Sequence, residues 1–323
     1  MNTLTLDQLN RDINEFLIFK HGMGNPYHRG EAALRSFVRY AHHHSRPRRQ
    51  AIIDFERTLK GWLSRNCDRK AVTIANDLGA VRQLCLHCRR RDPGFYVPEH
   101  ALAPQTESVF TPHIFSKVEI IQVLAAAERH LGKNIWAGML HTLLVVLYCT
   151  GLRFGEAVRL RLGDVDLEHS VFFIRESKGR SRLVPFGNDL AQVIIAYLEE
   201  RELILTKHAI TEDTLFVRLS GQPLTINTAS SAVVRLLRQQ GLKPAKGREG
   251  PRPFDFRHAF AVHRLTAWYQ QGVDIQARLP WLSAYMGHVN LLGTEAYLRA
   301  TPELLQFASD RFEHRFKHSR AMQ

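Results

Sequence analysis

The sequence predicts a mainly α protein with a small β-sheet, an α+β fold, divided into two domains. Apolar residues recur at helical spacing through most of the 323 residues, a length above that of one common domain. One pair of alternating segments, 171–175 and 182–186, has the pattern of a β-hairpin. The proline-rich stretch 92–112 has no sustained period and is typical of a linker. We therefore expect a helical domain over residues 1–105 and a second domain over 106–323.

The first domain is predicted to consist of helices. Four amphipathic segments lie at residues 4–20, 31–44, 51–66 and 71–91. The last one ends in Arg89, Arg90 and Arg91. Basic residues between apolar anchors fit either a solvated helix face or a face that contacts DNA. Four such segments in succession favour DNA contact.

The second domain opens with a capping box, Ser116 followed three residues later by Glu119. The apolar run 139–152 is too short to span a bilayer and is expected to form a buried helix that ends at Gly151. Arg153 follows, just before a short helix that contains Glu156. A charged side chain beside a buried helix needs a partner, which the sequence offers as Glu156 or Asp164.

The remaining elements lead to the C-terminal part of the domain. Lys178 lies in the turn of the predicted hairpin, where a lysine often serves solubility alone. Helices are expected over 189–203 and 227–242, with a short strand and turn at 214–225 between them. Another helix is expected to begin near Arg257, and a helix N-terminus with an arginine is suited to bind an anion.

The segment 286–299, MGHVNLLGTEAYLR, places His288 and Tyr297 nine residues apart. The preceding LPWLSAY has helical spacing, so Gly287 is expected to end that helix. If the loop folds back, the tyrosine lies within reach of the histidine. A phenol has an intrinsic pKa near ~10, so a nucleophilic tyrosine needs cations that stabilise its phenolate.

Composition points to an anionic partner. Lysine and arginine total 44 against 31 acidic residues, a formal net charge of +13, which favours double-stranded DNA over a merely solvated basic surface. The N-terminal residues lack the features of a secretory signal, so we expect a cytoplasmic protein without a membrane partner. Cys85 and Cys88 form a lone CxxC with no second pair, so neither a metal site nor a cofactor is predicted.

Four motifs occur in one order: TGLRFGEAVRL, SKGRSRLVPF, FDFRHAFAVHRL and MGHVNLLGTEAY. Together they resemble the tyrosine recombinase (phage integrase) family over about residues 108–310. The resemblance implies an integrase-like catalytic domain in the second half of the chain. The first half is similar to the family's core-binding domain in size and position only.

The resemblance implies a role for each matched residue. Arg153 and Arg257 would grip the scissile phosphate, and Tyr297 would attack phosphorus to form a 3′-phosphotyrosine link. Lys178 would protonate the departing 5′-oxygen, and His288 would donate a hydrogen bond to the phosphate or assist the tyrosine. The set is completed by Glu156, which would orient Arg153, and by candidate DNA contacts at Arg89, Arg90, Arg91, Arg180 and Arg182.

The sequence departs from the family pattern at one place. The family usually has histidine three residues before the second arginine, where this chain has Phe254. His258 follows the arginine directly and is expected to point elsewhere on the helix. Loss of one such donor typically costs on the order of 3 kcal/mol, or about 10²–10³ in rate.

The C-terminal segment is expected to form a helix that begins after Thr301 with Pro302 in its first position. This tail packs either on its own domain or, as the resemblance implies, on a neighbouring protomer of a homo-tetramer assembled on DNA, alone or with companion recombinases, and we favour the neighbouring protomer. Its predicted apolar stripe comprises Leu304, Leu305, Phe307 and Phe312.

Three functions are compatible with these features. The first is a site-specific recombinase or integrase of a mobile element, active in DNA integration or transposition. The second is a strand-relaxing, topoisomerase-like relative with the same chemistry. The third, which Phe254 suggests, is a DNA-binding protein on a catalytically weakened recombinase scaffold.

Overall fold

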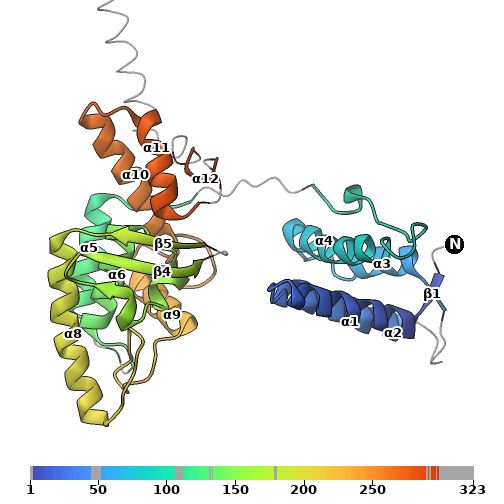
Figure 1. The fold of residues 1–323 in the computed structure, drawn as a ribbon, viewed down its shortest axis with the longest axis horizontal. Coiled ribbons are helices and arrows are strands. Elements are labelled where there is room, and N and C mark those ends of the chain that lie inside the picture. Colours follow the sequence, from blue (N-terminus) through green and yellow to red (C-terminus); the bar gives the residue numbers. More distant parts are fainter. Residues whose placement is uncertain are drawn as a thin grey trace, which may run out of the picture. The chain divides into compact units, whose positions relative to one another are not determined.

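The computed structural model describes residues 3–44, 52–105, 112–130, 132, 134–177, 180–288, 290, 292–295 and 297. The chain divides into two compact units, Met1–Val109 and Phe110–Gln323 (Figure 1). The sequence placed the change of domain at residue 105. The fold is mainly α with small antiparallel sheets, which confirms the predicted class. None of the described helices is long and apolar enough to cross a membrane.

The first unit is built from helices that follow the predicted segments. They are α1 (Leu6–Gly22), α2 (His28–His44), α3 (Phe55–Leu63) and α4 (Ala71–Cys88), followed by the short 3-10 helix η1 (His100–Leu102). Their buried faces enclose a core of large side chains that includes Phe16, Phe37, Phe55 and Trp62. Cys85 and Cys88 lie in this core as free thiols.

Two helices of this unit begin later than the sequence predicted. Residues Thr3–Thr5 (β1) and Ile52–Asp54 (β2) form an antiparallel pair instead of extending α1 and α3 backwards. Each strand ends in the residue that caps the next helix. Thr5 accepts a hydrogen bond from the amide of Gln8 at 3.1 Å, and Asp54 accepts one from the amide of Arg57 at 3.0 Å.

The second unit packs helices around one very apolar helix. The helices are α5 (Lys117–Glu128), α6 (Ala137–Thr150), α7 (Phe154–Val158), α8 (Asn188–His208), α9 (Ile226–Gln239), α10 (Asp255–Gln270), α11 (Ile275–Met286) and α12 (Leu292–Glu295). Nearly every residue of α6 from Met139 to Leu147 is buried, as expected for a helix in the centre of a domain. The capping box of Ser116 and Glu119 forms at the start of α5, which confirms that prediction.

A three-stranded antiparallel sheet lies beside these helices, in the order β3-β4-β5. The 3-10 helix η2 (Leu162–Asp164) leads into β3 (Val165–Asp166), and β4 (Val171–Ser177) and β5 (Arg180–Pro185) form the predicted hairpin. The segment 214–225 was predicted as a short strand and turn. It contributes only isolated bridges, Arg161 with Thr214 and Val217 with Pro223.

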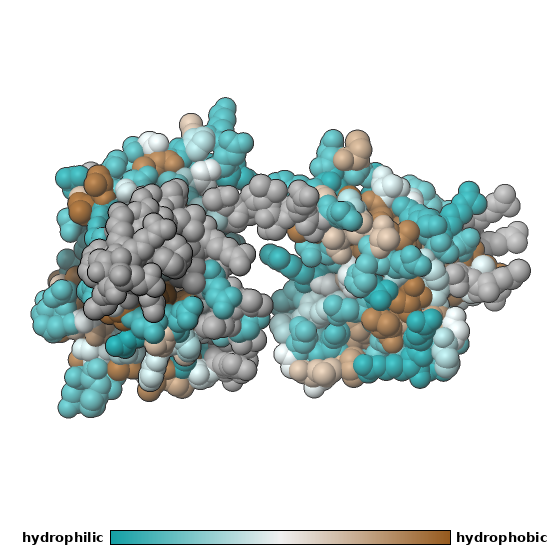
Figure 2. Space-filling view, turned by 90° about the horizontal axis from the view of Figure 1, so that it is seen from above, coloured by the Kyte–Doolittle hydropathy of each residue, from teal (hydrophilic) through white to brown (hydrophobic). Residues whose placement is uncertain are grey.

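Helices α10 and α11 pack together and carry the C-terminal part of the described chain (Figure 1). Their apolar side chains form a separate core cluster that includes Phe260, Leu282, Met286 and Tyr297. On the face of the molecule seen in Figure 2, hydrophobic residues form small separate patches among hydrophilic ones. The predicted site residues lie at the C-terminal end of α11, where several elements meet.

Candidate active site

The C-terminal end of α11 is closed by Gly287, as the sequence predicted. Gly287 adopts the left-handed conformation with φ of +69°. Its amide donates to the carbonyl of Ala284 at 3.0 Å, and the amide of His288 donates to the carbonyl of Ser283 at 3.0 Å. This ending directs the chain sharply away from the helix and leaves the carbonyls of residues 285–287 available to other donors.

Three arginines from three different elements donate to those three successive carbonyls. The pairs are Arg182 Nε to Tyr285 O (2.9 Å), Arg257 Nη2 to Met286 O (2.7 Å) and Arg153 Nη2 to Gly287 O (2.6 Å). The negative end of the helix dipole favours cations at this position. Positive charge is thereby concentrated where α11 ends and the segment towards the tyrosine begins.

Glu156 forms ion pairs with two of these arginines, Arg153 and Arg182, and its side chain is only 2% exposed. Its carboxylate accepts from the amide of Arg153 at 2.9 Å and from Arg153 Nη1 at 2.7 Å. It also accepts from Arg182 Nη1 at 3.2 Å and Nη2 at 2.8 Å. Of the two partners considered for Arg153, Glu156 is the one observed, because Asp164 pairs instead with Arg175 at 2.5 Å.

Arg257 is the most deeply buried of the three arginines, with 2% of its surface exposed. In addition to Met286, it donates from Nη1 to the carbonyl of Gly151 at 2.7 Å, so it joins the ends of α6 and α11. Burial lowers the pKa of Arg257 to about 10, and the nearby Tyr297 opposes this effect. The guanidinium therefore remains charged at neutral pH.

Tyr297 lies beside Arg257 and is 5% exposed. Burial raises the pKa of its phenol, while the charge of Arg257, a hydrogen bond with Arg257 and the charge of Arg153 act in the opposite direction. In the resting site the tyrosine is thus a neutral phenol beside two fixed cations. Such an arrangement can stabilise negative charge that develops during attack on a phosphate.

Two imidazole rings flank the tyrosine. The ring of His288 is 6.2 Å from that of Tyr297, centroid to centroid, and its Nδ1 is hydrogen-bonded to Oγ1 of Thr294 at 2.7 Å. The ring of His258 is 5.4 Å from that of Tyr297. The expectation that His258 points away from the site is therefore wrong, since α10 directs the residue after Arg257 towards the tyrosine.

Phe254 and His258 are one helical turn apart and lie on the same face of α10. Their ring centroids are 5.0 Å apart, and Phe254 is 39% exposed. Burial lowers the pKa of His258, and the carboxylate of Asp255, 3.9 Å away, opposes this effect. His258 is thus a neutral imidazole near neutral pH, next to the position where the sequence lacks the usual histidine.

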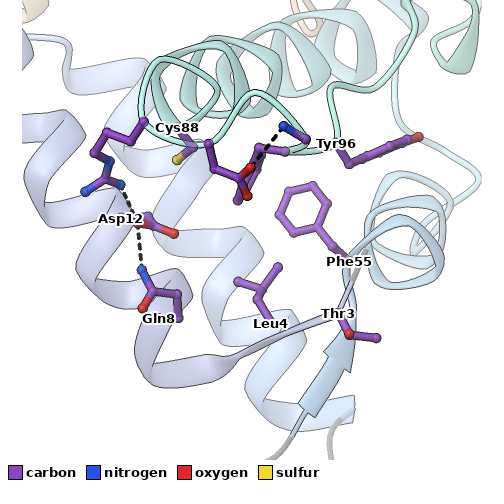
Figure 3. Close-up of a pocket in the computed structure, with 11 residues that line it drawn as sticks. Thr3, Leu4, Gln8, Asp12, Phe55, Cys88 and Tyr96 are labelled. Atoms are coloured by element: carbon purple, nitrogen blue, oxygen red, sulfur yellow. Dashed lines mark hydrogen bonds and ion pairs between the residues drawn. The ribbon is translucent and has the colours of Figure 1, made fainter. Parts of the chain in front are cut away.

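The remaining predicted residues either lie outside the described part of the chain or have contacts within the first unit. Lys178, the side chain of Arg180 and the C-terminal segment after residue 297 lie outside the described residues. Arg91 pairs with the buried Asp12 at 2.7 Å and also with Glu15. The same carboxylate of Asp12 accepts a hydrogen bond from Gln8 at 3.0 Å in a pocket of the first unit (Figure 3).

The other two arginines at the end of α4 also have local contacts. Arg89 donates to the carbonyl of Pro93 at 3.3 Å, and the guanidinium of Arg90 lies 5.3 Å from the centre of the Phe19 ring. DNA contact by Arg89, Arg90 and Arg91 stays a prediction. The sequence also gave no signal for the contacts of Arg182 or of Thr294, because their partners are distant in sequence or lie in an irregular loop.

Residues 115–303 match the model of the phage integrase family. The chain belongs to this family. It is 32% identical over 310 residues to the putative integrase/recombinase y4rB of Sinorhizobium fredii, which covers 94% of this chain and 97% of that protein. It is also 25% identical over 237 residues to tyrosine recombinase XerC of Staphylococcus epidermidis, covering 73% and 74% of the two chains. This protein is therefore a tyrosine-type site-specific recombinase.

Solved structures share the fold at lower sequence identity. The Tn1549 transposon integrase, in complex with transposon right end DNA, has a TM-score of 0.66 and 17% identity, covering 95% of this chain and 99% of that one. A lambda integrase tetramer bound to a Holliday junction has a TM-score of 0.60 and 16% identity, covering 95% and 78%. At this identity the likeness establishes the fold of the recombinase alone.

Proposed function

We propose that this recombinase cuts and rejoins double-stranded DNA through Tyr297, with a 3′-phosphotyrosine intermediate. The observation that carries the proposal is the burial of Tyr297 beside Arg257, to which it is hydrogen-bonded, with Arg153 close enough to influence its pKa. A phosphate placed at the tyrosine would meet two guanidinium groups at once. Each can donate to two phosphate oxygens.

The proposed reaction uses the residues that the sequence matches to the family. The phenol oxygen of Tyr297 attacks phosphorus and passes its proton to His288 or to solvent, a bond to phosphorus forms, and the bond to the 5′-oxygen breaks. Arg153 and Arg257 stabilise the charge on the non-bridging oxygens. Lys178 donates a proton to the departing 5′-oxygen as general acid, and His288 assists at the phosphate or the phenol. The covalent link keeps the phosphodiester energy, so a 5′-hydroxyl can reverse the reaction and reseal the strand.

The setting of this reaction is proposed from the relatives. An integrase of a mobile element is the function suggested by the description of the family and by the transposon integrase with the same fold. A homo-tetramer on DNA is suggested by the lambda integrase tetramer. Sedimentation of the full chain with its DNA site tests the assembly: four protomers on two duplexes are expected, and a persistent monomer on each duplex would contradict it.

A duplex with a nick close to the cleavage position tests the chemistry, because the short released fragment diffuses away and traps the covalent complex. The binding site is first selected from random DNA with the full chain. We expect a covalent protein–DNA adduct with the native chain and none with Tyr297→Phe. The matched control is Tyr285→Phe, since Tyr285 is a neighbouring tyrosine whose hydroxyl donates to the carbonyl of Pro185 at 2.9 Å. An adduct that survives Tyr297→Phe refutes the proposal.

Phe254 favours a second candidate, a DNA-binding protein on a catalytically weakened recombinase scaffold. Its side chain offers no donor at a position 39% exposed beside the site. Loss of one such donor corresponds to about 10²–10³ in rate. The nicked duplex and two marked duplexes separate the functions: a covalent adduct and recombinant products support the recombinase, whereas tight binding with neither adduct nor recombinants supports the DNA-binding protein.

A further inference from the structure

Arg182 of β5 is more completely engaged by the protein than a DNA-contacting arginine needs to be. Its side chain is 12% exposed. Nε donates to the carbonyl of Tyr285, and Nη1 and Nη2 both donate to Glu156. All three nitrogens of the fork are therefore committed to two neighbours within the same unit.

The end of α11 is also shaped to receive this guanidinium. A Cβ atom on residue 287 would lie 2.8 Å from Cζ and 2.8 Å from Nη1 of Arg182, closer than such atoms approach. Gly287 thus leaves the space in which the planar group of Arg182 lies against the backbone. This contact is independent of the hydrogen bonds and places Arg182 at the point where the chain turns towards His288.

The hydrogen bonds form a closed circuit through three elements. Arg182 joins β5 to Glu156 of α7, Glu156 joins to Arg153, and Arg153 returns to the carbonyl of Gly287. Tyr285 O and Gly287 O, two residues apart, complete the circuit through Arg182. A shift of any member displaces the guanidinium of Arg153 relative to the end of α11.

The circuit also sets the charge of the site. Glu156 with Arg153 alone would be a neutral pair, and its positive field towards a phosphate would be weak. With Arg182 on the same carboxylate, the buried group of three carries one net positive charge. Arg182 therefore balances Glu156 and leaves the charge of Arg153 effective for an anion.

We propose that Arg182 is a positioning residue of the recombinase, which holds Arg153 against the end of α11 and neutralises Glu156. It acts through these two neighbours and does not contact the DNA backbone. This inference rests on the proposed function, because its effect is read in the cleavage step at Tyr297.

The test is single-turnover cleavage of the nicked duplex at saturating protein, with binding measured separately across salt concentrations. In Arg182→Met we expect cleavage to fall by about 10²-fold, the loss typical of a displacement near 1 Å in an active site. We expect the dissociation constant to change by less than about threefold, and the slope of its logarithm against that of salt to stay as in the native chain. A slope reduced by about 0.9, with weaker binding, would identify Arg182 as a phosphate contact and overturn the proposal.

If Arg182→Met does not fold, Arg182→Lys tests the same proposal. The ammonium keeps the charge but cannot donate in a planar fork to both oxygens of Glu156 and to the carbonyl of Tyr285. We expect cleavage at least about tenfold slower than native with the melting temperature close to native. Native cleavage in this variant would overturn the proposal.

The control is Arg161→Met, which removes an arginine whose ion pair with Asp213 is long, 3.6 Å, and exposed. It should cleave at the native rate, so loss of cleavage in the control as well as in Arg182→Met would contradict a specific role for Arg182. Different results refute the nucleophilic role of Tyr297 and the positioning role of Arg182. If the native chain forms no adduct at Tyr297, the proposed function is refuted. If it does and Arg182→Met matches it, only the role of Arg182 is refuted.

Discussion

Replacing Glu156 by glutamine tests whether this carboxylate holds the arginines of the site in place. Its side chain is 2% exposed, and among the described residues Arg153 and Arg182 each donate two hydrogen bonds to it. Glutamine has the same size, so no cavity forms. However, its amide nitrogen cannot accept, and the guanidinium groups of Arg153 and Arg182, which are 18% and 12% exposed, then lie together without an anion.

Breaking a buried ion pair typically costs about 3–5 kcal/mol. We expect about 3 kcal/mol for Glu156→Gln, the lower end of that range, because the amide oxygen still accepts from one side. That amount is a large part of the roughly 5–15 kcal/mol that stabilise a domain. Amide hydrogen exchange in α6 and α7, followed at increasing urea concentration in the full chain, measures the free energy of unfolding of the second unit separately from that of the first.

The control for Glu156→Gln is Asp213→Asn in the same unit. Asp213 pairs with Arg161 at 3.6 Å, and both side chains are more than 60% exposed. Such an exposed pair contributes about 0–1 kcal/mol. If Glu156→Gln lowers the free energy of unfolding by less than about 1 kcal/mol, Glu156 does not hold the two arginines, and the explanation of the site fails.

Three further results are expected. Gly287→Ala should lower the free energy of unfolding by about 1–2 kcal/mol from the left-handed conformation alone, with more from the displaced Arg182; an unchanged urea midpoint would contradict this. Unfolding free energy should fall as pH drops below about 6.5, because unfolded imidazoles bind protons that the buried ones resist; a midpoint independent of pH between 7 and 5 would disagree. The logarithm of DNA affinity should fall with that of salt by about 0.9 per phosphate contact, and a flat response would exclude DNA as the partner. The histidines whose pKa is lowered by burial are His87, His130, His141 and His258.

Local signals in the sequence were enough to place the helices. Ser116 and Glu119 marked the start of α5, and Gly287 marked the end of α11, because caps depend on neighbouring residues only. The pairing of β1 with β2 joins segments about fifty residues apart, and each is three residues long. A pattern of three residues has too little period to distinguish a strand from the first turn of a helix.

The difference between signals from neighbouring residues and contacts between distant segments also holds for the site. The sequence identified Arg153, Glu156, Arg257, His288 and Tyr297, and the structure brings these together around the end of α11. The contacts of Arg182 and His258 were not predicted, because they depend on how β5, α10 and the last described residues pack. Sequence spacing gives the face of a helix on which a residue lies but not what covers that face.

The most direct test of Tyr297 as the nucleophile is to locate the DNA on the polypeptide. The adduct from the nicked duplex is digested with nuclease and trypsin, and cleavage after Arg278 and Arg299 releases residues 279–299. This peptide contains both Tyr285 and Tyr297, so fragmentation in a mass spectrometer distinguishes them. We predict a nucleotide remnant on Tyr297. A remnant on Tyr285, or on a peptide elsewhere in the chain, would contradict the assignment of the nucleophile.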